Sequence, residues 1–485
     1  MSLSLTGKVG YISLGRGLAA LSSLAAGMLL SRYLTRSAYG TYRQLWLIYN
    51  TLSPLLSLGL PTSINYFIPQ ANDDEKKIFN LQTFSLLTFG GIILSSIFFF
   101  AAPEIARIFH NPDLILAARV FALIPVLTLP TLYYQNLFIS LNRAVLVAKL
   151  SAGLGLGRLI AVSIPVLLNS GLIGVLSGLV VFSLGQFVLV TYLMFTPARS
   201  YRFYWRKDLL LRQLRYAAPI GLSFIVGTWI KQTDKMVIST FFTPSQYAIY
   251  VNGAIEIPLI GVLTGSVTAV LMPEFVRLHS GGNVDRLIFL WHRAIRKVGL
   301  IILPTMVFLL LYASEFLILL FSDKYADSAG IFRIYLLALP NRITTFGTIL
   351  LAAGLSTIVM RYAVYTLLLN TALAYLLVHF VGFSGPAIGT VLAIYFIAFL
   401  QLREITKLMQ TKWMSIFPWS DLALIIAIAL VAGGAASWPK VVPLHFDDWL
   451  RFLLGGLTFV VCYLPLVLWT GLLKKRDVLA FWRQK

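Results

Sequence analysis

Charged residues are scarce in this chain of 485 residues, and acids are much scarcer than bases. Only 12% of the residues are charged, about half the share that is usual in soluble domains. This leaves no room for a large soluble domain. Lys and Arg number 39 against 18 Asp and Glu, so the formal net charge is +21. Because 58% of the residues are hydrophobic, the basic excess first reports membrane topology rather than nucleic-acid binding.

The sequence also lacks the ligands and side-chain groupings of most catalytic sites. Cys462 is the only cysteine, which excludes disulfide frameworks and thiolate metal sites. The histidines are scattered without metal-ligand spacing. Ser, His and Asp do not cluster as in a nucleophilic triad, and paired carboxylates of the hydrolase type are missing. We therefore expect no metal, no cofactor and no enzymatic activity.

Long apolar stretches run almost from end to end of the chain. About fourteen of them are candidates to cross a bilayer, which takes roughly 20 residues of helix, although the thirteenth is short. They include residues 40–67, 247–272, 330–353 and 422–436. The sequence thus predicts an all-α polytopic membrane protein. The first stretch is interrupted by Arg16 and continues to Leu30, which favours a retained transmembrane helix over a cleaved signal peptide.

The connections between these stretches differ in basic content. Those near Asn169, Thr243 and Gly382 hold no Lys or Arg, whereas the alternate connections and the C-terminal tail hold many. The positive-inside rule therefore predicts a multi-pass protein of the inner (cytoplasmic) membrane with both termini in the cytoplasm. Several basic residues on the predicted outer side run against this rule: Arg32, Arg36, Arg107, Lys324 and Lys440.

An internal repeat organises the helices into two halves. The string from Leu34 to Tyr42 (LTRSAYGTY) returns as FTPSQYAIY from Phe242 to Tyr250. A weaker echo pairs the segment at Ala102 with the segment at Ala313. Six helices per half is an even number, so the halves enter the membrane in the same orientation. A pseudo-twofold axis along the membrane normal and a central cavity follow from this arrangement.

The repeat predicts four regions. They are a six-helix bundle (1–198), a basic cytoplasmic elbow (199–215), a second six-helix bundle (216–409), and two extra transmembrane helices with a basic tail (410–485). Aromatic residues alternate with arginines in the elbow. An RNA-binding patch would have this composition, but an interfacial segment against anionic lipid is favoured in a membrane protein. The glycines at 153, 155 and 157 are interpreted as helix packing rather than as a phosphate loop, because no strand precedes them.

Charged residues within the apolar stretches are the candidate functional residues. Lys231, Asp234 and Lys235 are spaced by three and four residues, which favours one helical face. They could bind an anion in a cavity, or they could be a cluster that reaches toward an interface. Other charges lie inside or at the edge of predicted spans: Arg16, Arg43, Arg158, Arg333, Arg342 and Glu256. Pro340 and Pro258 predict broken helices beside Arg342 and Glu256.

Each of these charges could be paired structurally inside the bundle. The cations outnumber the acids Asp234 and Glu256, however, so pairing alone does not account for all of them. A cation near the bilayer centre costs about 2.5–3.5 kcal/mol even on insertion scales and normally faces water or a partner. The sequence therefore predicts a hydrated, electropositive cavity for an anionic substrate.

The sequence resembles the oligosaccharide flippases of the multidrug/oligosaccharidyl-lipid/polysaccharide exporter superfamily, in its polysaccharide-biosynthesis branch. The resemblance rests on Ser31-Arg32 with Leu34 to Tyr42, Gly59-Leu60-Pro61, Asn65-Tyr66-Phe67, and Leu210 to Ile220 with its Tyr216-Ala217-Ala218-Pro219. It implies two six-helix bundles with two trailing helices and alternating access. It also implies a cationic lumen, which Arg16, Arg158, Lys231, Lys235 and Arg342 would supply in this chain.

The cargo that the resemblance implies is an undecaprenyl-pyrophosphate-linked oligosaccharide, moved to the periplasmic leaflet for O-antigen, capsule or exopolysaccharide synthesis. Membrane lipids are the other expected partners, and nucleic acid is not expected. Coupling to H+ or Na+ through Asp234 or Glu256, and contact with polymerase and chain-length proteins, stay open. Three alternatives remain: a cation-coupled multidrug antiporter of the same superfamily, a membrane-embedded glycosyltransferase or polymerase, and a scaffold.

Overall fold

The computed structural model describes residues 5–196, 205–344, 346–442 and 447–472. In these residues every regular element is a helix, which confirms the predicted all-α class. The chain divides into two compact units, Met1–Ala248 (unit 1) and Ile249–Lys485 (unit 2). The division falls inside helix α12 (Pro244–Gly253). This division, at residues 248 and 249, lies further along the chain than residue 216, where the repeat predicts that the second bundle begins. The predicted division into four regions stays a prediction.

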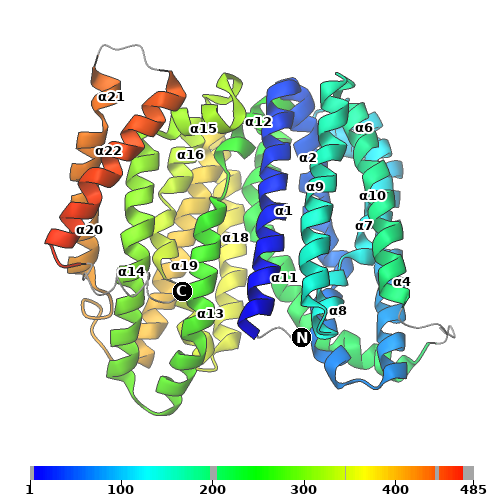
Figure 1. The fold of residues 1–485 in the computed structure, drawn as a ribbon, viewed down its shortest axis with the longest axis horizontal. Helices are drawn as coiled ribbons and strands as arrows, with labels where there is room; N and C mark the ends of the chain where they lie inside the picture. The colour runs from blue at the N-terminus through cyan, green and yellow to red at the C-terminus, as the bar shows by residue number, and fades with distance from the viewer. Residues whose placement is uncertain (1–4, 197–204, 345, 443–446, 473–485) are drawn as a thin grey trace. The chain divides into compact units, whose positions relative to one another are not determined.

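Unit 1 is built from long helices joined by short ones (Figure 1). The long helices are α1 (Leu5–Tyr33), α2 (Arg36–Ser57), α4 (Asp73–Phe100), α9 (Ala144–Leu167), α10 (Gly171–Phe195) and α11 (Lys207–Phe241). The short helices are α3 (Leu60–Phe67), α5 (Ala102–Ile108), α6 (Leu114–Phe121), α7 (Leu123–Thr128) and α8 (Tyr134–Ser140), with 3-10 turns at Ile68–Gln70 and Leu129–Thr131.

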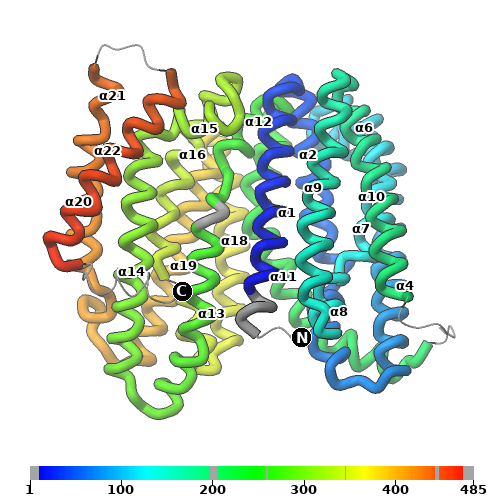
Figure 2. The backbone as a smooth tube through the Cα atoms, in the orientation of Figure 1, coloured from blue at the N-terminus to red at the C-terminus, as the bar shows by residue number. Residues whose placement is uncertain are grey.

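Unit 2 follows the same plan and adds the trailing helices (Figure 2). Its first part holds α13 (Pro258–Ser280), α14 (Val284–Leu311), α15 (Ala313–Phe321), α16 (Ser328–Leu336), α17 (Phe346–Ala352), α18 (Ser356–Phe380) and α19 (Gly385–Leu408). It also has 3-10 turns at Asp323–Tyr325, Leu339–Ile343 and Gly382–Ser384. The trailing helices are α20 (Trp419–Ala436), α21 (Trp438–Val441) and α22 (Asp448–Trp469), and α20 packs against α22.

The nine-residue repeat found in the sequence forms the same turn twice. After α1, the hydroxyl of Thr35 accepts a hydrogen bond of 3.2 Å from the backbone N–H of Ala38 and caps α2. After α11, the hydroxyl of Thr243 accepts one of 3.3 Å from the N–H of Gln246 at the start of α12. A threonine at an N-cap satisfies a donor that the helix leaves unpaired. The sequence repeat therefore marks a structural repeat.

Helix breaks recur at equivalent places in the two repeats. α2 and α3 are separated at Leu58–Gly59, and α12 and α13 are separated by the non-helical residues 254–257. The 3-10 turn that contains Pro130 matches the one that contains Pro340. At the second of these, α16 and the following helical segment are bent by 44°. The breaks expected at Pro258 and Pro340 are thus confirmed.

The predicted number of spans is close to what the structure holds. Among the described residues, 12 helices are long and apolar enough to cross a membrane, or 13 with the bent pair α16–α17. The expected span at residues 40–67 corresponds to α2 and α3, which are broken and carry Arg43, Gln44 and Asn50. The expected short span at 422–436 is part of a longer helical stretch, Trp419–Val441.

Two helix pairs in unit 1 approach closely, and glycines make this possible. A Cβ on Gly155 of α9 would lie 2.6 Å from the Cα of Ala19, so α1 lies directly against α9 (Figure 1). A Cβ on Gly221 of α11 would lie 2.4 Å from the carbonyl carbon of Leu58, and Gly59 there has a φ of +73°. These contacts confirm helix packing for Gly155. Small residues are what lets membrane helices approach in this way.

An ion pair joins the trailing helices to the rest of unit 2. The Nζ of Lys440 lies 2.6 Å from Oε1 of the buried Glu315, and it lies 4.4 Å from the ring centroid of Tyr312. The hydroxyl of Tyr312 donates to the carbonyl of Ala436 at 2.7 Å. In unit 1, Arg107 forms only a local, exposed pair with Glu104, three residues earlier on α5. Of the basic residues that run against the positive-inside rule on the predicted outer side, Lys440 therefore serves a structural pair.

Replacing Lys440 by methionine should destabilise the protein by about 1–3 kcal/mol, because the carboxylate of Glu315 would stay buried without its partner. The measurement is thermal unfolding in detergent. Lys407→Met is the matched control, since its pair with Glu404 is exposed. The double variant Glu315→Gln/Lys440→Met should recover part of the loss. Equal melting temperatures for Lys440→Met and Lys407→Met would contradict this role.

Part of the predicted elbow lies outside the described residues. Residues 199–204, with Tyr201, Phe203 and Tyr204, are not described, and neither is the basic tail from residue 473. From Lys207 onward the elbow forms the first turns of α11. The interfacial interpretation of this segment stays a prediction.

Candidate functional site: a basic cluster in unit 1

The candidate residues of unit 1 lie on α1, α2, α9 and α11, which pack as the pairs α1–α9 and α2–α11. We call Arg16, Arg43, Arg158, Lys231 and Lys235 the basic cluster. Their positions along the helices follow from a rise of 1.5 Å per residue. Arg43 lies roughly 10 Å from the start of α2, and Asp234 lies roughly 10 Å from the end of α11. Arg158 lies roughly 14 Å from the end of α9. Arg16 is further away, at roughly 26 Å from the end of α1.

Arg16 is held by an amide rather than by a carboxylate. Its Nε and one terminal nitrogen donate to Oε1 of Gln135 on α8, at 3.2 and 2.9 Å. The Nε2 of Gln135 donates to the hydroxyls of Tyr134 and Ser151, both at 3.2 Å. This chain of neutral partners orients the guanidinium and leaves its positive charge uncompensated. The side chain of Arg16 is exposed within unit 1.

Arg158 stacks on an aromatic ring. Its guanidinium carbon lies 4.5 Å from the ring centroid of Trp46 on α2. Trp46 is in turn fixed by edge contacts with Tyr49 and Phe121, and the hydroxyl of Tyr49 is 2.9 Å from that of Thr128. A cation over an indole face is stabilised by the ring quadrupole. Stacking occupies one face of the guanidinium and leaves its N–H groups available to an anion.

The third part of the site combines Arg43 with the charges of α11. Arg43 lies 5.9 Å from the ring centroid of Tyr39, on the same helix α2. Asp234 is only 1% exposed, and its Oδ1 is 3.5 Å from Nζ of Lys235. That Nζ also donates to the carbonyl of Lys231 at 2.8 Å. The carboxylate of Asp234 is therefore buried beside the ammonium group of Lys235 on the same helix.

A buried polar network fixes α2 against α11 beside these charges. The Nε2 of Gln44 donates to the hydroxyl of Ser239 at 2.9 Å. The Nδ2 of Asn111 donates to Oε1 of Gln44 at 2.7 Å and to the hydroxyl of Thr41 at 2.9 Å. Buried polar groups that are fully paired rigidify a site. The network therefore holds α2, which carries Arg43, against α11, which carries Asp234.

The three arginines of the cluster share one electrostatic property. Within the described residues, no carboxylate lies within ion-pair distance of the guanidinium groups of Arg16, Arg43 or Arg158. Their partners are an amide, a phenol and an indole. Asp234 is the acid that pairs with the cluster, through Lys235. The arrangement therefore carries net positive charge and has N–H donors suited to phosphate oxygens.

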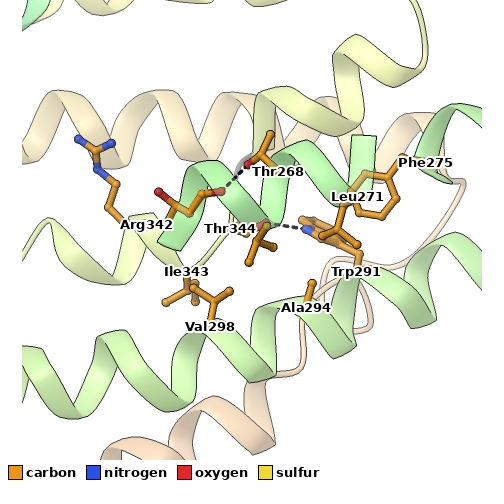
Figure 3. Close-up of a pocket in the computed structure, with 11 residues that line it drawn as sticks. Thr268, Leu271, Phe275, Trp291, Ala294, Val298, Arg342, Ile343 and Thr344 are labelled. Carbon is orange, nitrogen blue, oxygen red and sulfur yellow. Dashed lines mark hydrogen bonds between the residues drawn. The ribbon is translucent and has the colours of Figure 1, made fainter. Parts of the chain in front are cut away.

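The candidate residues of unit 2 are arranged differently. Arg333 is exposed, and its Nε donates to the carbonyl of Leu310 at 3.3 Å. Arg342 lies 3.5 Å from Oε1 of Glu256, and these side chains are 47% and 65% exposed. The pair joins two helix breaks, because Glu256 lies between α12 and α13 and Arg342 lies in the 3-10 turn before α17. Arg342 also lines a pocket (Figure 3).

Sequence reasoning missed the neutral partners of the cluster. Gln135, Trp46 and Tyr39 set the positions of the arginines but were not among the candidates. Gln135 could have been found, because an amide in an apolar stretch needs a polar partner. Trp46 and Tyr39 carry no such signal. As to metals, the described part of the chain holds no group of three or more His, Cys, Asp or Glu side chains placed to bind an ion.

The fold is similar to that of several solved membrane proteins. Lipid II flippase MurJ in an inward closed conformation superposes with a TM-score of 0.76 at 16% identity, over 96% of this chain and 99% of that chain. An inward-facing multidrug resistance MATE family transporter of the MOP superfamily gives a TM-score of 0.65 at 15% identity, over 81% and 96%. A MOP superfamily transporter from Pyrococcus furiosus, described as having a binding pocket of reverse polarity, gives a TM-score of 0.53 at 15% identity, over 83% of this chain and 95% of that chain.

The family model described as "Polysaccharide biosynthesis protein" matches residues 29–330, which is more than half of the chain. The chain belongs to this family of polysaccharide biosynthesis proteins, as the sequence resemblance indicated. No curated protein matches the sequence.

Proposed function

We propose that this protein flips an undecaprenyl-pyrophosphate-linked oligosaccharide from the cytoplasmic to the periplasmic leaflet of the inner membrane, for the synthesis of O-antigen, capsule or exopolysaccharide. The observation that carries the proposal is the basic cluster of unit 1, whose arginines are oriented by neutral groups. The N–H groups of these arginines are suited to the oxygens of a dianionic pyrophosphate. Its sugars would cross with it, while the lipid tail stays in the bilayer.

The proposed transport is alternating access through a cationic cavity, with both termini in the cytoplasm. When an anion moves outward across an inside-negative membrane, its free energy falls by about 2.3 kcal/mol per charge per 100 mV. Hydrolysis is therefore not required, and we propose that the protein is not an enzyme. Asp234 and Glu256 are the candidates for coupling to H+ or Na+, and polymerase and chain-length proteins are the candidate protein partners.

A multidrug antiporter of the same superfamily is the second candidate. The observation that favours it is the buried carboxylate of Asp234, which is 1% exposed and could attract a cationic drug or a proton. The net positive charge of the cluster argues against a cationic substrate. Ethidium efflux that is lost in Asp234→Asn would support the antiporter.

The test is reconstitution into liposomes with a fluorescent polyprenyl-pyrophosphate oligosaccharide in both leaflets. An added reductant quenches the fluorescent label in the outer leaflet only. Flipping brings inner-leaflet lipid within its reach, so the flipping rate is measured as the further loss of fluorescence. We expect the protein to accelerate this loss several-fold over protein-free liposomes. Liposomes with the protein but no acceleration would contradict the proposed function. Incorporation of labelled sugar by the isolated protein would instead indicate a glycosyltransferase or polymerase.

A further inference from the structure

The connection between α19 and α20 in unit 2, residues 409–418, carries an exposed surface that the basic cluster does not explain (Figure 2). Ile416 and Phe417 at its far end are buried, whereas Trp413 and Met414 are 38% and 78% exposed. Large apolar side chains left open on a connection need apolar surroundings. The edge of a bilayer supplies them, and it is where tryptophan is enriched in membrane proteins.

The buried end fixes the connection against unit 2. The ring of Phe417 packs against those of Trp291 and Phe346, with centroid distances of 5.4 and 5.9 Å. The Nε2 of His292 on α14 lies 2.9 Å from the carbonyl oxygen of Ile416. These contacts make the connection part of the fold, so the residues just before it are held in a defined place.

The exposed end is a turn that lies along α19. The backbone N–H and the hydroxyl of Ser415 both donate to the carbonyl of Lys412, each at 3.0 Å. Inside this turn, Trp413 packs on Phe399 of α19, with the ring centroids 5.4 Å apart. Phe399 is exposed and lies roughly 14 Å before the end of its helix. The turn therefore places the indole of Trp413 beside an apolar, exposed part of α19.

Two cations lie next to these aromatic rings. Arg403 follows Phe399 by four residues, so the two side chains lie on the same face of α19. Lys412 directly precedes Trp413, and both cations are exposed. Long basic side chains at the edge of an apolar surface extend toward the headgroups of the bilayer. The surface thus combines apolar rings with positive charge.

The acids at this end of unit 2 are engaged elsewhere. Glu404 lies 3.1 Å from Lys407, and Asp421 lies 2.6 Å from Arg296. In the part of the chain that the structure describes, neither of the two cations beside the rings has a carboxylate within ion-pair distance. Their charge is therefore left for a group outside the protein.

We propose that the surface formed by Arg403, Lys412, Trp413 and Met414 binds an anionic phospholipid of the adjacent leaflet, such as phosphatidylglycerol. The charged headgroup lies against the two cations, and the two apolar side chains lie beside the glycerol and the first acyl carbons. This lipid stays in its leaflet, so the site does not depend on which substrate the protein moves. In the proposed topology the leaflet is the cytoplasmic one, where anionic lipid attracts basic segments.

The test measures which lipid lies beside position 414 of the full-length protein in liposomes. Cys462→Ser removes the only cysteine, and Met414→Cys then accepts a bimane label. The label is quenched by contact with lipids that carry a doxyl group near the glycerol end of an acyl chain. Doxyl phosphatidylglycerol should reach half-maximal quenching at a mole fraction about tenfold below that of doxyl phosphatidylcholine, because each surface cation favours the anionic lipid several-fold.

Variants of the labelled protein test the charges separately. Arg403→Gln and Lys412→Gln should each lower this preference about threefold, and the double variant should abolish it. Lys149→Gln is the matched control, because it removes an exposed cation of α9 in unit 1, and it should keep the full preference. A label at Phe380→Cys, which is 82% exposed beside a connection without Lys or Arg, should be quenched equally by the two lipids.

Equal quenching by the two lipids at position 414 overturns the proposal, and so does a preference that persists in the double variant. Quenching by neither lipid also overturns it, since the turn would then lie away from the membrane. Displacement of doxyl phosphatidylglycerol by polyprenyl pyrophosphate, but not by the same mole fraction of unlabelled phosphatidylglycerol, would make this a substrate site and overturn it as well. The comparison of lipids uses the unaltered cations, so it holds even if a charge variant does not fold.

A second measurement needs no label. Phosphatidylglycerol added to the wild-type protein in detergent should raise the apparent melting temperature, because a ligand of the folded state stabilises it. The double variant Arg403→Gln/Lys412→Gln should show a much smaller rise, and equal rises would contradict the site. Flipping is measured in the same liposomes. Flipping without a preference for phosphatidylglycerol at position 414 removes the lipid site and leaves the proposed function intact, whereas the preference without flipping removes the proposed function.

Discussion

Replacing Arg158 by alanine should lower the flipping rate of a pyrophosphate-linked lipid by about tenfold to a hundredfold. The guanidinium is stacked on Trp46 with its donors available, and a charge-assisted hydrogen bond to a phosphate is worth about 1.5–3 kcal/mol. The measurement is the initial flipping rate in liposomes at subsaturating substrate. Arg158→Ala should also weaken binding of the pyrophosphate lipid by a similar factor.

Two further variants test the reason for this loss. Arg158→Lys keeps the charge but loses the planar stacking and the bidentate geometry, so it should retain only part of the activity. Trp46→Phe keeps an aromatic face and should be milder than Trp46→Ala. A rate for Arg158→Ala equal to that of the wild type would show that this side chain does not contact the substrate.

Replacing Gly221 by alanine should strongly reduce the yield of folded protein. A Cβ at this position would lie 2.4 Å from the carbonyl carbon of Leu58 and 2.8 Å from the backbone nitrogen of Gly59. Those atoms belong to the backbone and cannot rotate away, so α11 must move from α2 and α3. Overpacking of this kind costs about 1–3 kcal/mol or more. The measurement is the monodisperse fraction in detergent by size-exclusion chromatography, with the apparent melting temperature.

Gly227→Ala is the matched control for this prediction. It lies on the same helix, and nothing lies within 4 Å of a Cβ built on it. It should express and melt like the wild type. If the two alanine variants behave alike, close packing of α11 on the α2–α3 break is not needed for the fold.

The fold was largely predictable because the strongest signals in the sequence are physical and local. Apolar length predicted the helices, and the nine-residue repeat predicted that two turns would be alike, as the Thr35 and Thr243 caps confirm. Prolines predicted the breaks near Pro258 and Pro340. The contacts of α11 were not predictable in this way. They depend on Gly59 and Gly221, which are far apart in the sequence and meet only in the folded unit.

The candidate site was predictable in its charges but not in its partners. Charged residues in apolar stretches stand out in any membrane sequence, which is why Arg16, Arg158 and Asp234 could be selected. Spacing on α11 suggested that Lys231, Asp234 and Lys235 share a face, yet Asp234 is buried while Lys231 is exposed. Which neutral side chain orients an arginine depends on contacts between distant helices, and periodicity along one helix does not report them.

The claim that a phosphate group is what the protein recognises is tested most directly by changing only the linkage of the lipid. Flipping rates of two lipids with the same oligosaccharide and the same polyprenyl tail are compared in liposomes that contain the wild-type protein. One lipid has a pyrophosphate linkage, and the other has a neutral ether linkage. We expect the protein to flip the pyrophosphate lipid at least tenfold faster than the neutral lipid. Equal rates for the two lipids would contradict a role for the basic cluster in recognition.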